Sequence, residues 1–208
     1  MASLKNIACG IIAAFLLWAL MFSPLTAPHL NFWALMTLSA LILSSLAFLS
    51  AGNWKQRLRF KLSDVAWGLA IAGGLWCIFW AGEAVSAQLF DFAKPEVQAI
   101  YSIREKLSPL ALSMLLMCLI GPAEEIFWRG YIQEQLSLRW GANTGLILTC
   151  ALYTAVHLSS CNYMLVMASC VAGSAWGICY RLFPRRFPAI ILSHALWDAA
   201  VFIWFPIH

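Results

Sequence analysis

Two adjacent glutamates stand inside one of the most apolar stretches of the chain. Glu124 and Glu125 belong to the string GPAEEIFWRGY, residues 121–131, which continues an apolar run. A charged side chain at the centre of a membrane helix costs about 2.5–3.5 kcal/mol on insertion scales, so such residues usually mark a functional pathway or a paired structural charge. These carboxylates could therefore supply a general base or the acidic half of an ion pair.

Helical geometry gives the two carboxylates different neighbours. At about 100° per residue, Glu125 and Arg129 stand roughly 40° apart on one helix face, within reach of a salt bridge. Glu124 points about 140° away from Arg129, so it is not the natural partner of that arginine. A carboxylate that no cation neutralises can accept a proton from water. Pro122 precedes the pair, and its missing N–H predicts a kink that opens a polar pocket.

Two histidines occur in similar spacing patterns further along the chain. Tyr153 and His157 form one i, i+4 pair, and His194 and Asp198 form another, so each pair presents two polar groups on one helix face. A single histidine in a membrane helix is often only an interhelical hydrogen-bonding residue. All these polar groups must nevertheless find an interior site, and sharing one is the least costly arrangement. We therefore expect Glu124 and both histidines to surround one pocket.

Three ordered motifs are similar to those of one protein family. EExxxRG at residues 124–130, an aromatic-xxx-His motif at 153–157 and HxxxD at 194–198 resemble the CPBP family. That family comprises membrane-embedded CAAX prenyl endopeptidases, bacteriocin-processing relatives and other glutamate-dependent intramembrane proteases. The resemblance covers residues 108–204.

The resemblance implies a role for each matching residue. Glu124, helped by His157, would activate a water for attack on a peptide carbonyl. Glu125 and Arg129 would form the structural ion pair that their spacing also predicts.

The last motif would bind the oxyanion that develops on the attacked carbonyl, a task for hydrogen-bond donors. His194 and Asp198 match it, but the best-understood members have asparagine in place of the aspartate. Asp198 can donate only when protonated, so it could instead orient His194. Tyr153 replaces the commoner phenylalanine and adds a hydroxyl group.

The composition defines the elements that must position these groups. Of the 208 residues, 62% are hydrophobic and 11% are charged, against about 25% charged in soluble domains. This excludes a water-soluble globule and predicts an all-α, polytopic membrane helix bundle with about seven transmembrane helices. The net charge of +4 indicates loop anchoring at a membrane and no nucleic-acid partner. The expected spans are residues 7–23, 31–50, 64–89, 108–136, 143–160, 163–181 and 187–206.

A polar connection at residues 91–108 divides the chain. We expect N-terminal transmembrane helices over residues 1–107 and a catalytic four-helix core over 108–208. Nine Lys and Arg residues fall in loops on one side, which predicts a multi-pass protein of the cell membrane with its N-terminus cytoplasmic and its C-terminus on the opposite side. The first span lacks a convincing cleavage site and is expected to be retained, with a cleaved signal as the alternative.

Straight helices would place the two histidines at different depths. Counted from the cytoplasmic edge, His194 lies about 10 Å deep and His157 about 21 Å deep. A shared pocket therefore requires tilted or broken helices.

The predicted function is an intramembrane endopeptidase that uses a glutamate-activated water and no cofactor. Its partners would be the lipid bilayer and a membrane-associated, lipid-modified or leader-bearing peptide or protein, with the oligomeric state open. A zinc enzyme is one alternative, with Glu124, His157 and His194 as ligands, but the HExxH motif is absent. The other is a non-catalytic scaffold, immunity-type binding protein or transporter, although no repeat indicates transport. Glu83 and Glu134 receive no catalytic role, and Glu134 is expected to be a surface charge.

Overall fold

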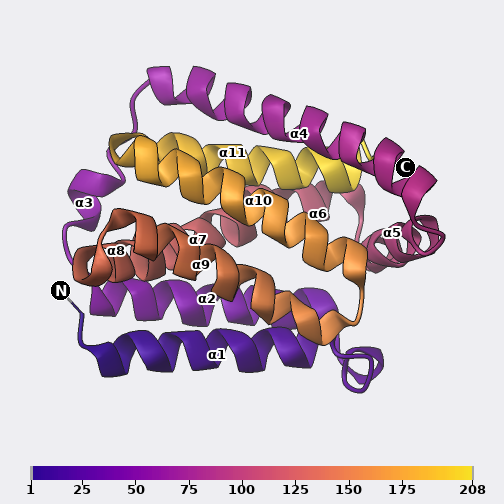
Figure 1. The fold of residues 1–208 in the computed structure, drawn as a ribbon, viewed down its shortest axis with the longest axis horizontal. Coiled ribbons are helices and arrows are strands. Elements are labelled where there is room, and N and C mark those ends of the chain that lie inside the picture. Colours follow the sequence, from indigo (N-terminus) through magenta and orange to yellow (C-terminus); the bar gives the residue numbers. More distant parts are fainter. Residues whose placement is uncertain (1, 208) are drawn as a thin grey trace.

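The protein is a bundle of helices that run between two ends of the molecule. The computed structural model describes residues 2–207, with side chains for all of them except residues 105 and 106, and no strand occurs in this part of the chain. The two chain termini lie at opposite ends of the bundle (Figure 1). The predicted all-α, polytopic fold is confirmed.

The first two helices form an antiparallel pair. They are α1 (Leu4–Phe22) and α2 (Phe32–Ser50), joined by the short η1 (Ala27–His29). Each begins at a polar N-cap, because the side chains of Ser3 and Asn31 accept hydrogen bonds from backbone N–H groups that the helix leaves unpaired. This pair covers one side of the bundle (Figure 1).

The third long helix covers the opposite side. After the short α3 (Trp54–Arg57), the chain continues as α4 (Ser63–Leu89), which packs along α11. The polar connection then forms α5 (Ala93–Ser102) and η2 (Ile103–Lys106). Glu96 ties this connection to the next part of the bundle, since its carboxylate accepts from the Met164 backbone N–H at 2.8 Å.

The predicted fourth span follows one helical path that changes its hydrogen-bonding pattern. It comprises α6 (Pro109–Leu115), the π-helix η3 (Leu116–Ile120), α7 (Gly121–Glu125), the π-helix η4 (Ile126–Gln133) and α8 (Glu134–Trp140). Pro122 cannot donate a backbone hydrogen bond, and the path is π-helical immediately before its turn. A Cβ at Gly121 would lie 2.8 Å from Ala195 Cα, so glycine allows α7 and α11 to approach closely.

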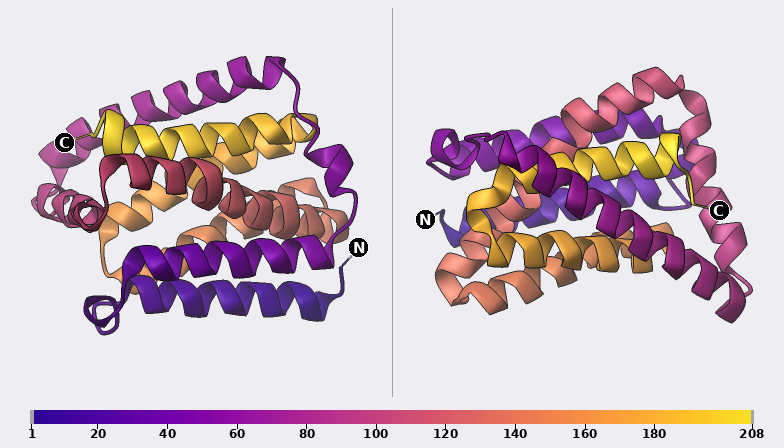
Figure 2. Two further views of the ribbon diagram at one scale, coloured as in Figure 1. Left: turned by 180° about the vertical axis from the view of Figure 1, so that it is seen from behind. Right: turned by 90° about the horizontal axis from the view of Figure 1, so that it is seen from above.

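The remaining elements complete the bundle. They are α9 (Ala142–Val156), η5 (His157–Ser160), α10 (Tyr163–Leu182), η6 (Pro184–Arg186), α11 (Phe187–Ala199) and the π-helix η7 (Ala200–Trp204). Seen from behind, the path from α6 to α8 lies between α2 and α11 (Figure 2). The helices that carry Glu124 and His194 are therefore central.

Six helical segments of the described residues are long and apolar enough to cross a membrane. They begin at residues 4, 32, 63, 109, 163 and 184. The predicted span 143–160 is not among them, because its α-helix has 15 residues before it tightens into η5. Even so, α9 runs from one end of the bundle to the other (Figure 1). The chain is a multi-pass membrane protein, and the count of seven spans is not confirmed.

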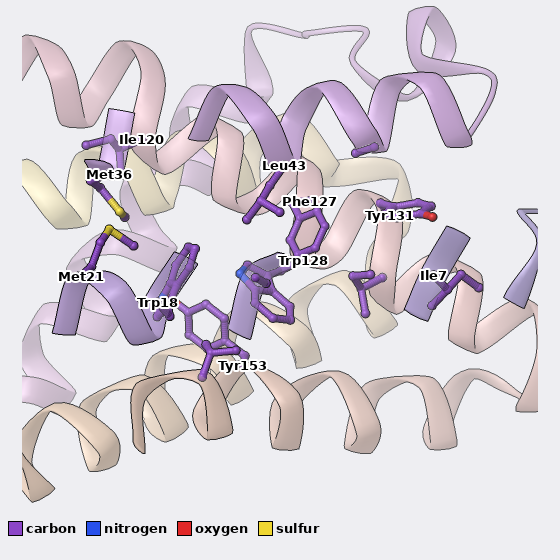
Figure 3. Packing of buried hydrophobic residues seen from close by; sticks show 14 of the residues in the cluster. Ile7, Trp18, Met21, Met36, Leu43, Ile120, Phe127, Trp128, Tyr131 and Tyr153 are labelled. Atoms are coloured by element: carbon purple, nitrogen blue, oxygen red, sulfur yellow. The ribbon is translucent and has the colours of Figure 1, made fainter. Parts of the chain in front are cut away.

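Two buried clusters hold the bundle together. The first lies between α1, α2 and η4 and includes Trp18, Leu43, Phe127 and Trp128 (Figure 3). The second lies between α4, α10 and α11 and includes Trp176 and other large side chains. Helix α1 packs on η5, α2 packs on η4, and α4 packs on α11. Residues 1–107 and 108–208 therefore share one bundle.

Basic side chains gather at the end of the bundle that holds the N-terminus. Alternating helix directions bring together the start of α1, the α3 region, the end of α8, the end of α10 and η6 (Figure 1). We call this the basic end. Its residues are Lys5, Lys55, Arg57, Arg59, Lys61, Arg139, Arg181, Arg185 and Arg186.

Candidate active site

A cavity of about 390 Å³ lies between the helices, toward the end opposite the basic end. Its walls come from many elements of the chain. They include the end of α1, the start of α2, the second half of α4, α5, η3 with α7, the end of α9, η5, α10, the end of α11 and η7. The lining is mostly apolar. It also includes Glu83, Glu124, His157, His194 and Asp198. The structure thus brings Glu124 and both predicted histidines to one cavity.

The cavity reaches the lipid-facing surface between α4 and α10. Ile78, Met167 and Val171 line it and are at the same time 54%, 38% and 41% exposed. At its far end, Tyr101 accepts a hydrogen bond from the Ile207 backbone N–H at 2.9 Å, and burial raises the pKa of its phenol. Residues of α5 and of the C-terminal segment therefore line the far end of the cavity, and its side reaches the surface between α4 and α10.

Glu124 is the carboxylate of the central helix that faces this cavity. Its side chain is 8% exposed, and its Oε2 accepts a hydrogen bond from the Tyr153 hydroxyl at 3.1 Å. No Lys or Arg of the described residues forms a salt bridge with Glu124. The tyrosine hydroxyl, whose position the sequence left open, thus holds one oxygen of the unpaired carboxylate.

Glu125 points into protein instead and is fully buried. Its Oε1 accepts from Arg129 Nη1 at 2.7 Å, so the predicted ion pair is present, and it lies 2.8 Å from His194 Nδ1. Arg129 also donates from Nη2 to the Gly173 carbonyl at 2.9 Å. The guanidinium lies over the Tyr153 ring, 4.9 Å from its centroid. This carboxylate is occupied by two cationic or donor groups.

His194 lies between two carboxylates. Nδ1 faces Glu125 at 2.8 Å, and Nε2 is 3.5 Å from Asp198 Oδ2 on the cavity side. The imidazole also stacks on the Trp176 ring, with centroids 3.7 Å apart and planes 14° apart. The sequence suggested Asp198 as the group that orients His194, whereas Glu125 makes the shorter contact. Sequence reasoning missed this contact because the two residues are far apart in the chain.

His157 is held at both ring nitrogens. Nδ1 lies 2.8 Å from the Tyr153 carbonyl oxygen, and Nε2 lies 3.2 Å from Trp18 Nε1. A carbonyl can only accept and an indole N–H can only donate, so Nδ1 carries the proton and Nε2 is the acceptor. Trp18 was not predicted as a site residue, because nothing distinguishes it from the other tryptophans of apolar spans.

The two histidines share the cavity because their helices are not parallel. Figure 1 shows α9 lying obliquely to α11. His157 follows the last residue of α9, at the first position of η5, whereas His194 lies within α11. The tilt compensates for the different depths that straight helices would give them.

Two other acidic residues lie apart from this site. Glu134 accepts a hydrogen bond from the Tyr180 hydroxyl at 2.8 Å, and Tyr180 accepts from Arg57 Nη2 at 2.7 Å. Glu134, which the sequence suggests is a surface charge, is half-buried and belongs to a network that holds α3 against α8 and α10. Asp64 pairs with Arg186 Nη1 at 2.9 Å at the basic end.

No group of three His, Cys, Asp or Glu side chains in the described part of the chain is arranged to hold a metal ion. The zinc alternative required three such ligands around one point.

The fold and the cavity define a polytopic helical membrane protein with an enclosed carboxylate and histidine site. Residues 106–200 match the family described as type II CAAX prenyl endopeptidase Rce1-like, which is consistent with the family that the motifs predicted. No curated protein and no solved structure matches the chain. The family indicates a protease, that is, a membrane peptide hydrolase. All the catalytic candidates lie inside the matched segment.

Proposed function

We propose that the protein is a glutamate-type intramembrane endopeptidase in which Glu124 activates the attacking water. The observation that supports this most directly is that two neighbouring carboxylates have different partners. Glu125 is occupied by Arg129 and His194, whereas Glu124 faces the cavity with only the Tyr153 hydroxyl as a partner. Only the second can receive a proton from a water in the cavity.

The reaction proceeds in two steps. Glu124 takes a proton from water, with His157 Nε2 as the second acceptor, and the hydroxide oxygen bonds to the peptide carbonyl carbon. The resulting tetrahedral oxyanion then collapses, the C–N bond breaks, and a proton passes from Glu124 to the leaving amine. The products are a carboxylic acid and an amine, which exchange the remaining proton to give a carboxylate and an ammonium group, and no redox change or cofactor is required.

The oxyanion would be stabilised from the α11 side of the cavity. His194 Nε2 and Asp198 line the cavity together, and the buried Glu125 lies on the other ring nitrogen. When both nitrogens are protonated, His194 can donate to Glu125 and to the oxyanion at the same time. Glu125 and Arg129 would then act through His194 and not on the substrate itself.

The substrate would be a peptide or protein at the membrane that carries an apolar or lipid group. The cavity is lined mainly by aromatic and aliphatic side chains and reaches the surface between α4 and α10, where lipid would lie. Prenylated C-terminal peptides, which would fit a family described as CAAX prenyl endopeptidases, and leader-bearing peptides both have the required chemistry.

The orientation in the membrane follows from the charge distribution. The basic end would face the cytoplasm, because Lys and Arg in short loops are retained there. The N-terminus would then be cytoplasmic and the C-terminus would lie on the other side of the cell membrane. Since the cavity lies toward the opposite end from the basic residues, it would be placed in the outer half of the bilayer.

The test is product analysis by mass spectrometry with the protein in lipid vesicles and with lipid-modified and leader-bearing candidate peptides. We expect Glu124→Gln to abolish cleavage, because glutamine keeps the shape and cannot accept the proton. Glu134→Gln is the matched control at the other end of the bundle and is expected to cleave normally. Cleavage by Glu124→Gln at the wild-type rate would contradict the mechanism.

A further inference from the structure

The first helix contributes a side chain to the catalytic region although it lies outside the family match. Trp18 on α1 is 2% exposed, and it lines the same cavity as Glu124 and His157. Its one polar atom, Nε1, donates to His157 Nε2 at 3.2 Å. Residues 106–200 alone would leave this histidine nitrogen without that partner.

The contact completes the positioning of the imidazole. The Tyr153 carbonyl holds Nδ1 at 2.8 Å, and Trp18 holds Nε2 on the other side of the ring. The His157 ring also packs against Phe22, Tyr153 and Trp18, with centroids 5.7, 5.1 and 6.1 Å apart. Turning the ring over would break both hydrogen bonds, because the nitrogens would be replaced by C–H groups.

The donor also determines which proton-transfer role His157 can take. An indole N–H cannot accept, so Nε2 must keep its lone pair while this contact lasts. At 3.2 Å the bond is at the long end of the usual range, and it joins two neutral groups. His157 Nε2 can therefore exchange the indole N–H for an O–H of an incoming water as its hydrogen-bond donor, at a small cost in free energy.

We propose that Trp18 is a positioning residue for the reaction: it holds the His157 ring at the cavity wall with Nε2 unprotonated, so that this nitrogen can accept from the attacking water. The first helix is then part of the active site and not only a membrane anchor. This inference rests on the proposed function, in which His157 assists Glu124.

The primary test is Trp18→Phe, which keeps an aromatic ring and removes the N–H donor. We expect kcat to fall roughly threefold to tenfold, the effect of losing one neutral hydrogen bond, with KM within about twofold. Trp128→Phe is the matched control, because Trp128 packs edge-on against Trp18 and its buried Nε1 has no hydrogen-bond partner among the described residues. It should keep the wild-type kcat. An unchanged kcat in Trp18→Phe overturns the proposal.

A double-mutant cycle separates positioning from general packing. If Trp18 acts through His157, then Trp18→Phe has no further effect on kcat in a His157→Ala background. If the two effects multiply, Trp18 acts independently of the histidine and the proposal is wrong. Cleavage by Glu124→Gln would refute the proposed function itself, whereas normal cleavage by Trp18→Phe beside an inactive Glu124→Gln refutes only this inference.

A spectroscopic measurement tests the contact without activity and without depending on the stability of Trp18→Phe. The Trp18 indole N–H proton resonance, assigned by NMR in detergent micelles, should move when His157→Ala removes its acceptor. The Trp128 indole resonance should move less. An unchanged Trp18 resonance in His157→Ala would show that the hydrogen bond is absent, and the proposal would fall with it.

Discussion

The two neighbouring glutamates allow one substitution to be compared at adjacent positions. Glu125→Gln removes the negative charge from a fully buried group that Arg129 contacts at 2.7 Å and His194 at 2.8 Å. Arg129 is 1% exposed, so its charge would remain buried without a counter-ion. Removing one partner of a buried pair typically destabilises a protein by about 3–5 kcal/mol.

Glu124→Gln should behave in the opposite way. Glu124 makes one side-chain hydrogen bond, with Tyr153, and a glutamine carbonyl oxygen can accept it equally well. We expect a stability change of less than about 1 kcal/mol, since no ion pair is broken. Activity, however, should be lost, because the general base is removed.

The assay is thermal unfolding in detergent by intrinsic fluorescence, combined with peptide cleavage. For a chain of this size, a loss of about 3–5 kcal/mol corresponds to a Tm lower by roughly 6–20 °C. Glu125→Gln should show that decrease, whereas Glu124→Gln should melt within a few degrees of wild type and be inactive. If Glu125→Gln melts like wild type, or if Glu124→Gln shows the larger decrease, the assignment of base and ion pair is reversed.

Three further predictions concern the orientation of Glu124, the orientation of the protein in the membrane and the metal alternative. Tyr153→Phe removes the hydroxyl that holds Glu124, so kcat should fall by up to about tenfold with little change in Tm; an unchanged kcat would mean that the hydrogen bond does not orient the base. Cys161 is exposed and lies beyond η5, away from the basic end, so a membrane-impermeant maleimide should label it in intact cells; labelling only after lysis would reverse the proposed orientation. Full activity is expected after treatment with a strong chelator, and a loss that added zinc restores would favour the metal alternative.

The local part of the site could be predicted from the sequence because helix geometry alone determines it. Residues four apart share a helix face in any α-helix, which is why the Glu125 and Arg129 pair was expected and is present at 2.7 Å. The membrane class follows just as directly, because a composition with 62% hydrophobic residues can be satisfied by apolar helices in lipid.

The tertiary structure decided the contacts between helices, which depend on tilt, rotation and depth. The contacts of His194 with Glu125 and of Trp18 with His157 each join residues on different helices, at separations of 69 and 139 positions. No spacing rule relates such positions. The oblique course of α9, which brings His157 to the same cavity as His194, likewise results from packing against its neighbours (Figure 1). The sequence therefore identified the candidate catalytic residues, while packing determined that Glu125 is held by Arg129 and His194 and that Glu124 faces the cavity.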